Sequence, residues 1–193
     1  MRKLLLAAGL AVSLAAGGAA AQVQLPQGPP ITQPQLPPGT PTPQITPPCR
    51  VDLAITSITL NKLSRPGYAR VEFEVVNLGP SAWNSGANQQ LANLVVHNNA
   101  SGADYTLSVP FGARRIARNE RAARVVSTTI ANAWDTFEFG GTVQASLSFD
   151  PDIAIDGNPC NDDTNAANNT FNLTHAQVWA FISSTRTTQT FRR

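Results

Sequence analysis

The chain is poor in the residue types that most often carry out catalysis or hold metal ions. Its 193 residues include two cysteines and two histidines, and only 13% of the residues are charged. His97 and His175 do not lie in a metal-binding spacing, and no Gly-x-Ser-x-Gly sequence is present. We therefore expect a protein that is not an enzyme and needs no cofactor, apart from the calcium hypothesis given below.

Long hydrophobic runs are also scarce. The apolar stretch Leu4–Ala16 follows Arg2 and Lys3 and precedes the small residues Ala19–Ala21. A basic start, a short apolar stretch and a small-residue cleavage site are typical of a secretory signal peptide. We predict a signal peptide at residues 1–21 and a mature chain without a transmembrane segment, exported to the periplasm, cell surface or medium. An uncleaved membrane anchor is the alternative.

No excess charge of one sign remains after such a cleavage. Removing Arg2 and Lys3 from the 14 basic residues leaves 12, against 12 acidic residues. Domains that bind nucleic acids gather excess positive charge on one face. We therefore expect no nucleic-acid partner.

Proline recurs throughout residues 22–48, from Pro26 to Pro48. Because proline fixes φ and removes a backbone donor, neither a helix nor a central strand is expected here. We predict an extended polyproline II linker. A ligand for a proline-reading domain is the alternative.

From Cys49 to Arg193 the pattern is that of β-strands. Hydrophobic and polar residues alternate in two well-separated segments, as in half-buried strands, and their apolar members form the expected core: Val71, Phe73, Val75, Val143, Leu147 and Phe149. Between Ile55 and Ile58 the alternation shifts by one residue, which indicates a β-bulge or a change of face. Turn residues separate about seven such segments. We predict an all-β, immunoglobulin-like antiparallel β-sandwich of about seven strands over residues 49–193.

Three segments have a less regular pattern. Ser81–Gln90 is polar, and we predict a surface loop that tolerates replacement. An enlarged loop or hairpin within Ser81–Gly112 is expected to be the recognition element. Ala113–Val126 is expected to be strand, with a short helix as the alternative. Val178–Ile182 is apolar but short, and we predict part of the last strand.

Four segments together resemble a known bacterial family. Val51–Ile55 opens the domain, Val75–Pro80 ends the second strand, and Ser148–Asp152 precedes Asn165–Thr170. This combination resembles CARDB, the cell adhesion related domain found in bacteria. The resemblance implies an immunoglobulin-like sandwich on an exported bacterial protein, with no catalytic residues to transfer.

The chain departs from the CARDB pattern at two places. The part from Ser81 to Gly112 is longer than expected, and the chain continues beyond the expected last strand, from about Leu173 to Arg193. Both departures bear on where a partner would bind.

The two cysteines are predicted to form a disulfide. Cys49 precedes the first strand and Cys160 precedes the last, and an even number of cysteines in an exported protein favours pairing. Closing so long a loop stabilises a fold by about 4–5 kcal/mol in the chain-entropy model. Two free thiols are the alternative.

An oxygen-rich stretch from residue 150 to 163 contains candidate calcium ligands, because calcium takes six to eight oxygen ligands. The candidates are Asp150, Asp152, Asp156, Asn158 and Asp162. The spacing departs from that of an EF-hand loop. The alternative is a polar turn whose side chains cap their own backbone.

One cluster of basic residues stands out: Arg114, Arg115, Arg118, Arg121 and Arg124. It is a candidate surface for an anionic polymer or for lipid headgroups. A solvated hairpin, or pairing with the acidic stretch, is the alternative.

These observations favour a non-catalytic binding or structural module, related to adhesion or assembly, whose partner is a protein or a cell-surface polymer. One alternative is a carbohydrate-binding module that stacks sugar rings on exposed Trp83, Trp134 and Trp179. Another is a small hydrolase with an unrecognised site, for which Glu72 and Glu74 on one strand face would resemble a glycosidase pair.

Overall fold

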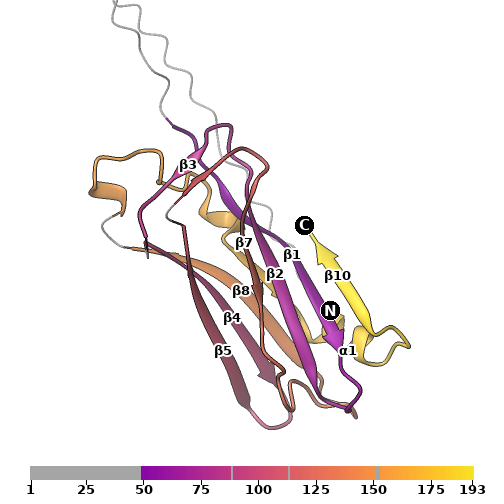
Figure 1. Ribbon diagram of the computed structural model, residues 1–193. Coiled ribbons are helices and arrows are strands. Elements are labelled where there is room, and N and C mark those ends of the chain that lie inside the picture. The colour runs from indigo at the N-terminus through magenta and orange to yellow at the C-terminus, as the bar shows by residue number, and fades with distance from the viewer. Residues whose placement is uncertain (1–48, 88, 113, 151–152) are drawn as a thin grey trace, which may run out of the picture. The chain divides into compact units, whose positions relative to one another are not determined.

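The structure is a computed structural model that describes residues 49–193, apart from 88, 113, 151 and 152. The predicted signal peptide and linker lie outside the described residues. Within these, two four-stranded antiparallel sheets pack face to face, accompanied by a two-stranded one (Figure 1). None of the helices in the described residues is both long enough and apolar enough to cross a bilayer.

The first large sheet has the order β10-β1-β2-β7 and the second the order β5-β4-β8-β9. The strands of the first sheet are β1 (Leu53–Lys62), β2 (Ala69–Asn77), β7 (Arg121–Val126) and β10 (Thr188–Arg192). Those of the second are β4 (Gln90–Asn98), β5 (Ala103–Phe111), β8 (Gly141–Phe149) and β9 (Thr170–Leu173). The small sheet pairs β3 (Trp83–Asn84) with β6 (Arg115–Ile116), and the helical segments are η1 (Ile153–Ile155), η2 (Ala166–Asn168) and α1 (His175–Ile182).

The strand order confirms the predicted antiparallel sandwich. Without β10, the described part of the two larger sheets comprises β1-β2-β7 and β5-β4-β8-β9. The first, second and fifth of these seven long strands therefore share one sheet, as in immunoglobulin-like sandwiches. The chain beyond β9 adds α1 and β10, and β10 extends the first sheet beside β1.

The predicted β-bulge is present in β1. The pairing of β1 with β2 shifts between Ile55 and Ser57. Both Ile55 and Ile58 are fully buried, because the extra residue between them turns the second half of the strand back toward the core.

The core lies between the two sheets. Val71, Phe73, Val75 and Val143 are at most 1% exposed, as predicted. Leu147 and Phe149 are only half-buried and pack against the rim of the core. Their alternation is that of a buried strand, but the facing sheet covers this end of β8 less completely.

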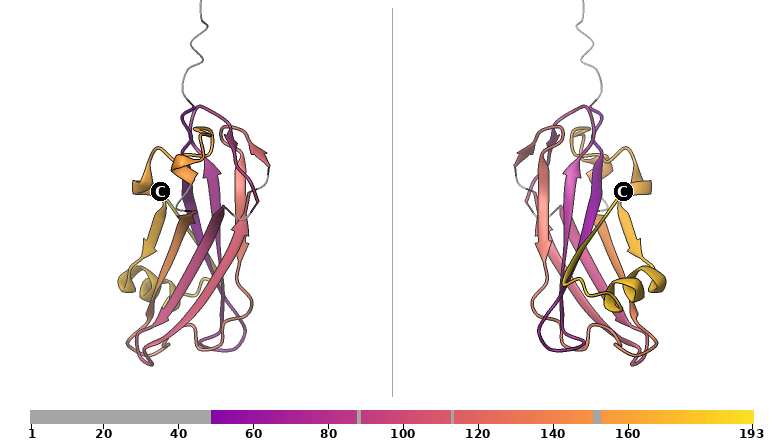
Figure 2. Two further views of the ribbon diagram at one scale, coloured as in Figure 1. Left: turned by 90° about the vertical axis from the view of Figure 1, so that its left-hand side faces the viewer. Right: turned by 90° about the vertical axis from the view of Figure 1, so that its right-hand side faces the viewer.

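The prediction of a strand at Val178–Ile182 was wrong, since these residues belong to α1. The Thr174 hydroxyl accepts a hydrogen bond from the Gln177 N–H, and the Gln177 side chain accepts one from the Thr174 N–H. This capping box starts the helix. Val178 and Phe181, three residues apart, are fully buried on one face of it. Figure 2 shows α1 at one edge of the sandwich.

The prediction of a free surface loop at Ser81–Gln90 was also wrong. Trp83, Ser85 and Gln90 in this segment are buried, and Trp83 is 0% exposed. The segment carries β3, which pairs with β6. The described part of residues 113–126 forms β6 and β7, so the strand interpretation of that stretch holds and the helix alternative does not.

Candidate functional site

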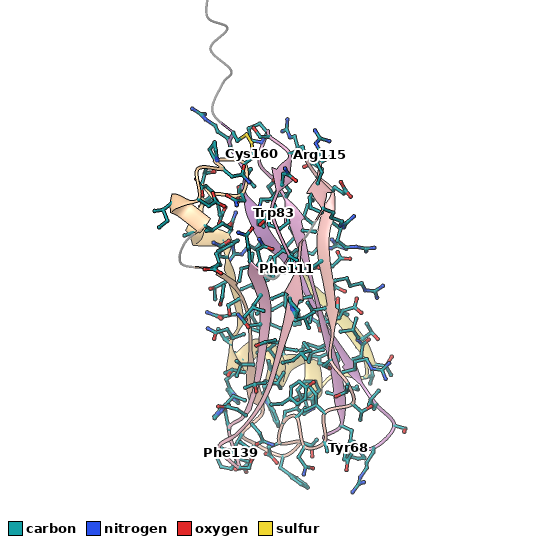
Figure 3. All side chains as sticks on the ribbon, turned by 60° about the vertical axis from the view of Figure 1, so that its left-hand side comes forward. Tyr68, Trp83, Phe111, Arg115, Phe139 and Cys160 are labelled. Atoms are coloured by element: carbon teal, nitrogen blue, oxygen red, sulfur yellow. A yellow bond between two sulfur atoms is a disulfide. The ribbon has the colours of Figure 1, made fainter. Side chains whose placement is uncertain are left out.

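The disulfide is formed as predicted, between Cys49 and Cys160. The Cys160 carbonyl accepts a hydrogen bond from the Asn84 N–H at 2.8 Å. The disulfide therefore connects the start of the domain to the loop before β9, and the hydrogen bond connects that loop to β3. Cys160 and Arg115 lie at one end of the sandwich, and Phe139 and Tyr68 at the other (Figure 3).

Asn77 at the end of β2 and Gly79 just after it have a structural role. Buried Asn77 donates to the carbonyls of Ser81 and Ile116 at 2.9 and 3.1 Å, and its Oδ1 accepts from the Gly79 N–H at 3.1 Å. A Cβ on Gly79 would lie 2.5 Å from the Arg50 carbonyl oxygen. Asn77 and Gly79 therefore hold together backbone segments that are far apart in the sequence, around residues 50, 81 and 116.

The arginine cluster is largely neutralised by glutamates. Arg124 contacts Glu72 at 2.8 Å, Arg121 contacts Glu74 at 3.0 Å, and Arg114 contacts Glu120 at 3.1 Å. The pKa of Arg124 is raised, first by its hydrogen bond to Glu72. The suggested pairing of these arginines with the acidic stretch was wrong. Their acidic partners lie on β2 and in the turn before β7 instead.

All five arginines are exposed, and two of them lack an acidic partner. Arg115 and Arg118 form no ion pair among the described residues. Two charges beside three neutralised arginines make a weak electrostatic surface, because exposed charges are screened over about 8–10 Å by salt. The cluster is therefore a poor candidate for binding an anionic polymer.

Part of the acidic stretch is satisfied by its own hydrogen bonds, whereas Asp162 Oδ1 is buried and has no hydrogen-bond partner. The Asp156 carboxylate accepts from the Asn161 side chain and from the Asn158 N–H, both at 2.7 Å, and these bonds lower its pKa. The Asn158 Oδ1 accepts from the Cys160 N–H at 3.1 Å. Asp152 lies outside the described residues. Among those described, no three His, Cys, Asp or Glu residues are grouped so as to hold a metal ion.

The tryptophans are mostly structural. Trp83 and Trp134 are at most 3% exposed, so neither offers a face on which a sugar ring could stack. Trp179 is half-buried, and its indole stacks on His175 with ring centroids 6.5 Å apart and planes 14° apart. Of the three, only Trp179 is placed to contact a ligand.

One histidine has a carboxylate partner. His97 Nδ1 lies 2.6 Å from Asp104 Oδ1, and Thr142 faces His97 on the next strand. The three residues form a row across β5, β4 and β8. A cavity of about 240 Å³ is lined by Val96 of β4, by residues 103–105 and by residues 129–133, so Asp104 lines it and His97 does not. The pair thus lies on a sheet face with only its carboxylate beside a cavity.

The largest exposed aromatic side chains lie together in a loop that the sequence patterns did not single out. Phe137 is 83% exposed and Phe139 56% exposed. We call residues 135–140 the aromatic loop. Its sequence signal is Asp-x-Phe-x-Phe-Gly between two strands. The alternation pattern marks such a segment only as a connection.

The aromatic loop is held in a defined shape. The Asp135 carboxylate accepts hydrogen bonds from the N–H groups of Phe137, Glu138 and Phe139, at 2.8–3.2 Å. The bond from Glu138 contributes most to a lowered pKa of Asp135. Gly140 closes the loop with φ +48°, and a Cβ there would approach the His175 ring to 3.1 Å. The loop therefore rests on α1.

Neighbouring loops complete a surface at this end, which we call the loop end: residues 63–68, 99–102 and 131–140. The Ala133 N–H donates to the Gly67 carbonyl at 2.8 Å, and the Asn98 amide donates to the Asn132 carbonyl at 2.9 Å. A cavity of about 620 Å³ opens between the three loops and is lined on one side by Phe137. The loop end is thus a shaped surface with exposed aromatic groups.

The aromatic loop should keep its shape at neutral and mildly acidic pH. The pKa of Asp135 is lowered in the folded protein. Its hydrogen bonds therefore stabilise the loop at pH values above the ordinary aspartate pKa, and this stabilisation is lost as the pH falls below about 4. The amide proton shifts of residues 137–139 should stay constant from pH 8 to 5 and move together below about pH 4. If these amide shifts moved between pH 5 and 7, the hydrogen bonds to the Asp135 carboxylate would not be their cause.

The geometry defines an antiparallel, immunoglobulin-like β-sandwich domain with an aromatic loop at one end. No protein-family model, curated protein or solved structure matches the chain. The resemblance to CARDB, which rests on sequence segments alone, stays a prediction.

Proposed function

We propose that the chain is an exported, non-catalytic module that binds a protein partner through the loop end. The observation that carries the proposal is the pair Phe137 and Phe139, exposed at the tip of a loop held by Asp135. Exposed aromatic side chains on a preformed surface are the usual anchors of protein interfaces. In sandwich domains, loops clustered at one end commonly bind.

Two further features support this proposal. The disulfide fits an oxidising compartment, where such bonds persist. It lies at the end of the sandwich opposite to Phe139, so the loop end stands away from the point where the domain begins. The resemblance to CARDB favours a role in adhesion or assembly.

The first test is crosslinking from position 137, with position 155 as the matched control. Phe137 and Ile155 are each 83% exposed, but Ile155 lies in η1, outside the loop end. A photo-crosslinking amino acid at position 137 should give one dominant crosslinked protein in the producing cells, and the same group at position 155 should not.

Binding to the protein so identified should then be measured with purified variants. Phe137→Ser with Phe139→Ser should weaken it at least tenfold, as expected for interface anchors. Ile155→Ser should leave it unchanged, and all variants should keep the melting temperature, because exposed positions contribute little to stability. Unchanged binding by the double variant would overturn the proposal.

A carbohydrate-binding function is the second candidate, favoured by one observation. Trp179 and His175 stack at the base of the aromatic loop, and the Asn99 side chain lies 3.2 Å from His175 Nδ1. Such an indole with neighbouring polar groups is able to hold a sugar ring. Affinity electrophoresis in soluble polysaccharides should show retardation that Trp179→Ala abolishes if this function applies.

A further inference from the structure

The long strand β5 has a free edge. It has nine residues, lies at the outer margin of its sheet, and pairs only with β4 in the described part of the chain (Figure 1). The open side of an edge strand presents a row of unpaired N–H and C=O groups, which is a template for pairing with another strand. An edge of this length therefore needs either protection or a partner.

The other three edge strands are protected, whereas β5 is not. Natural sheets protect their edges by keeping them short or by placing charged side chains on them. β9 has four residues, β10 has five including Arg192, and β7 has six including Arg121 and Arg124. The only charged residue of β5 is Asp104, and His97 Nδ1 lies 2.6 Å from its carboxylate. β5 thus lacks both of these protections.

The backbone groups of alternate β5 residues point to the free edge. The Asp150 N–H donates to the Gln89 carbonyl at 2.8 Å and continues the register of β4 with β8, so the odd-numbered residues of β4 bond to β8. The even-numbered residues of β4 therefore bond to β5, where they meet odd-numbered residues. Pro110, which has no N–H, falls in the outward-facing set, where proline is tolerated. The N–H groups that face the edge are those of Asp104, Thr106 and Ser108.

The apolar side chains of β5 are also incompletely covered. Tyr105, Leu107 and Val109 pack against the core, but they are only half-buried. The residues that alternate with them, from Asp104 to Pro110, are exposed. A strand added beyond β5 would cover the open flank of the half-buried side chains, and the burial of apolar surface would stabilise the assembly.

We propose that β5 pairs antiparallel with β5 of a second copy of this chain, around a two-fold axis at Thr106. This register places Thr106 opposite its own counterpart, and Asp104 opposite Ser108 of the other copy. Each N–H that faces the edge then meets a carbonyl, as in the hydrogen-bonded pairs of an antiparallel ladder. Pro110 lies beyond these pairs. On the core side of the joined sheet, apolar residues face apolar residues.

The charges of the chain favour a second copy as the partner. Without Arg2 and Lys3, 12 basic residues balance 12 acidic ones, so two copies carry no net charge that would repel. The register also keeps the two Asp104 carboxylates apart, because each lies opposite a serine. Since both copies use the same surface, the assembly closes at two chains and forms no filament.

This pairing goes beyond binding at the loop end and does not rest on it. The free edge is formed by the backbone of residues 104–108, whereas the exposed aromatic anchors are Phe137 and Phe139. The double replacement Phe137→Ser with Phe139→Ser should therefore leave dimerisation unchanged. Loss of the dimer in that variant would place the contact at the loop end and overturn the proposal.

The first experiment is oxidation of the mature chain carrying Thr106→Cys. Facing residues of a hydrogen-bonded antiparallel pair have Cα atoms about 5.5 Å apart, within the range that a disulfide spans. Because Cys49 and Cys160 are bonded to each other, the added thiol is the only free one. A mild oxidant should therefore convert this variant into a covalent dimer, visible on a gel without reductant.

The matched control is Ser108→Cys, an exposed position on the same edge. It should give little covalent dimer, because the two thiols would lie more than about 10 Å apart along the paired strands. The absence of a covalent dimer from position 106, or equal yields from both positions, would overturn the proposal.

Sedimentation equilibrium measures the dimer without a crosslink. Thr106→Lys would place two positive charges opposite each other at the axis and should weaken dimerisation roughly tenfold or more, because like charges brought together oppose association. Gln144→Lys, on the exposed face of the interior strand β8, should leave it unchanged. Equal dimerisation of the two variants would overturn the proposal, and so would monomer alone at about 1 mM of the unaltered protein.

A measurement on the unaltered protein covers the case in which these variants do not fold. Amide hydrogen exchange of Asp104, Thr106 and Ser108 should slow as the protein concentration rises, since pairing shields their N–H groups. The amides of residues 137–139, in the aromatic loop, should keep one exchange rate throughout. Exchange at the edge that does not depend on concentration would overturn the proposal, and protection confined to the aromatic loop would do so too.

Discussion

Replacing Trp83 with alanine should lower the free energy of unfolding by about 3–5 kcal/mol, the usual cost of truncating a buried aromatic residue. Trp83 is 0% exposed, and its ring lies 5.8 Å from that of Phe111. Its indole N–H also donates to the Asn161 carbonyl at 3.3 Å. The variant would thus leave a cavity and an unpaired carbonyl in the same place.

Urea denaturation followed by circular dichroism measures this loss. The matched control is Trp179→Ala, which truncates a half-buried tryptophan of α1 and should cost clearly less because less apolar area is removed from water. A loss below about 1 kcal/mol for Trp83→Ala would mean that Ser81–Gln90 is a surface loop after all.

Removing the disulfide should cost about 4–5 kcal/mol, the value expected when a loop of this size is no longer closed in the unfolded chain. The bond joins residues 111 positions apart. Because the bond is lost in every case, Cys49→Ser, Cys160→Ser and the double variant should be destabilised by similar amounts, and the two single effects should not add.

The same urea midpoints, with and without a reductant, test this prediction. Reductant should lower the midpoint of the unaltered protein and leave that of the double variant unchanged. Equal stability of the double variant and the oxidised protein would contradict it. Peptide mapping without reduction should find Cys49 linked to Cys160.

The two ends of the domain have different physical characters. Around Cys160, half-buried asparagines and aspartates join loops by hydrogen bonds. At the loop end, Phe137 and Phe139 are exposed. Hydrogen bonds between segments far apart in the sequence hold the first end together, whereas exposed aromatic groups gain free energy by being covered. This contrast is why we assign anchoring to the first end and recognition to the second.

The sequence by itself determined the elements whose pattern is local. Alternation with period two marked β2 and β8, and its shift by one residue located the bulge in β1. These predictions succeed because a strand exposes alternate residues to opposite faces wherever it lies. The pairing of Cys49 with Cys160 followed from there being only two cysteines.

Only the tertiary structure decided which residues meet at the ends of the strands. The local sequence placed Trp83 in a polar loop. Its burial depends on Phe111 and on the loop at Asn161, which are distant in the sequence. The apolar residues of α1 suited a strand as well as a helix, since so short a run has no distinct period. Arg121 and Arg124 pair with glutamates of β2 because β7 lies beside that strand. Neighbours brought together by strand order have no local signature, so contacts such as Asp52 with Asn168 arise only when the sheets assemble.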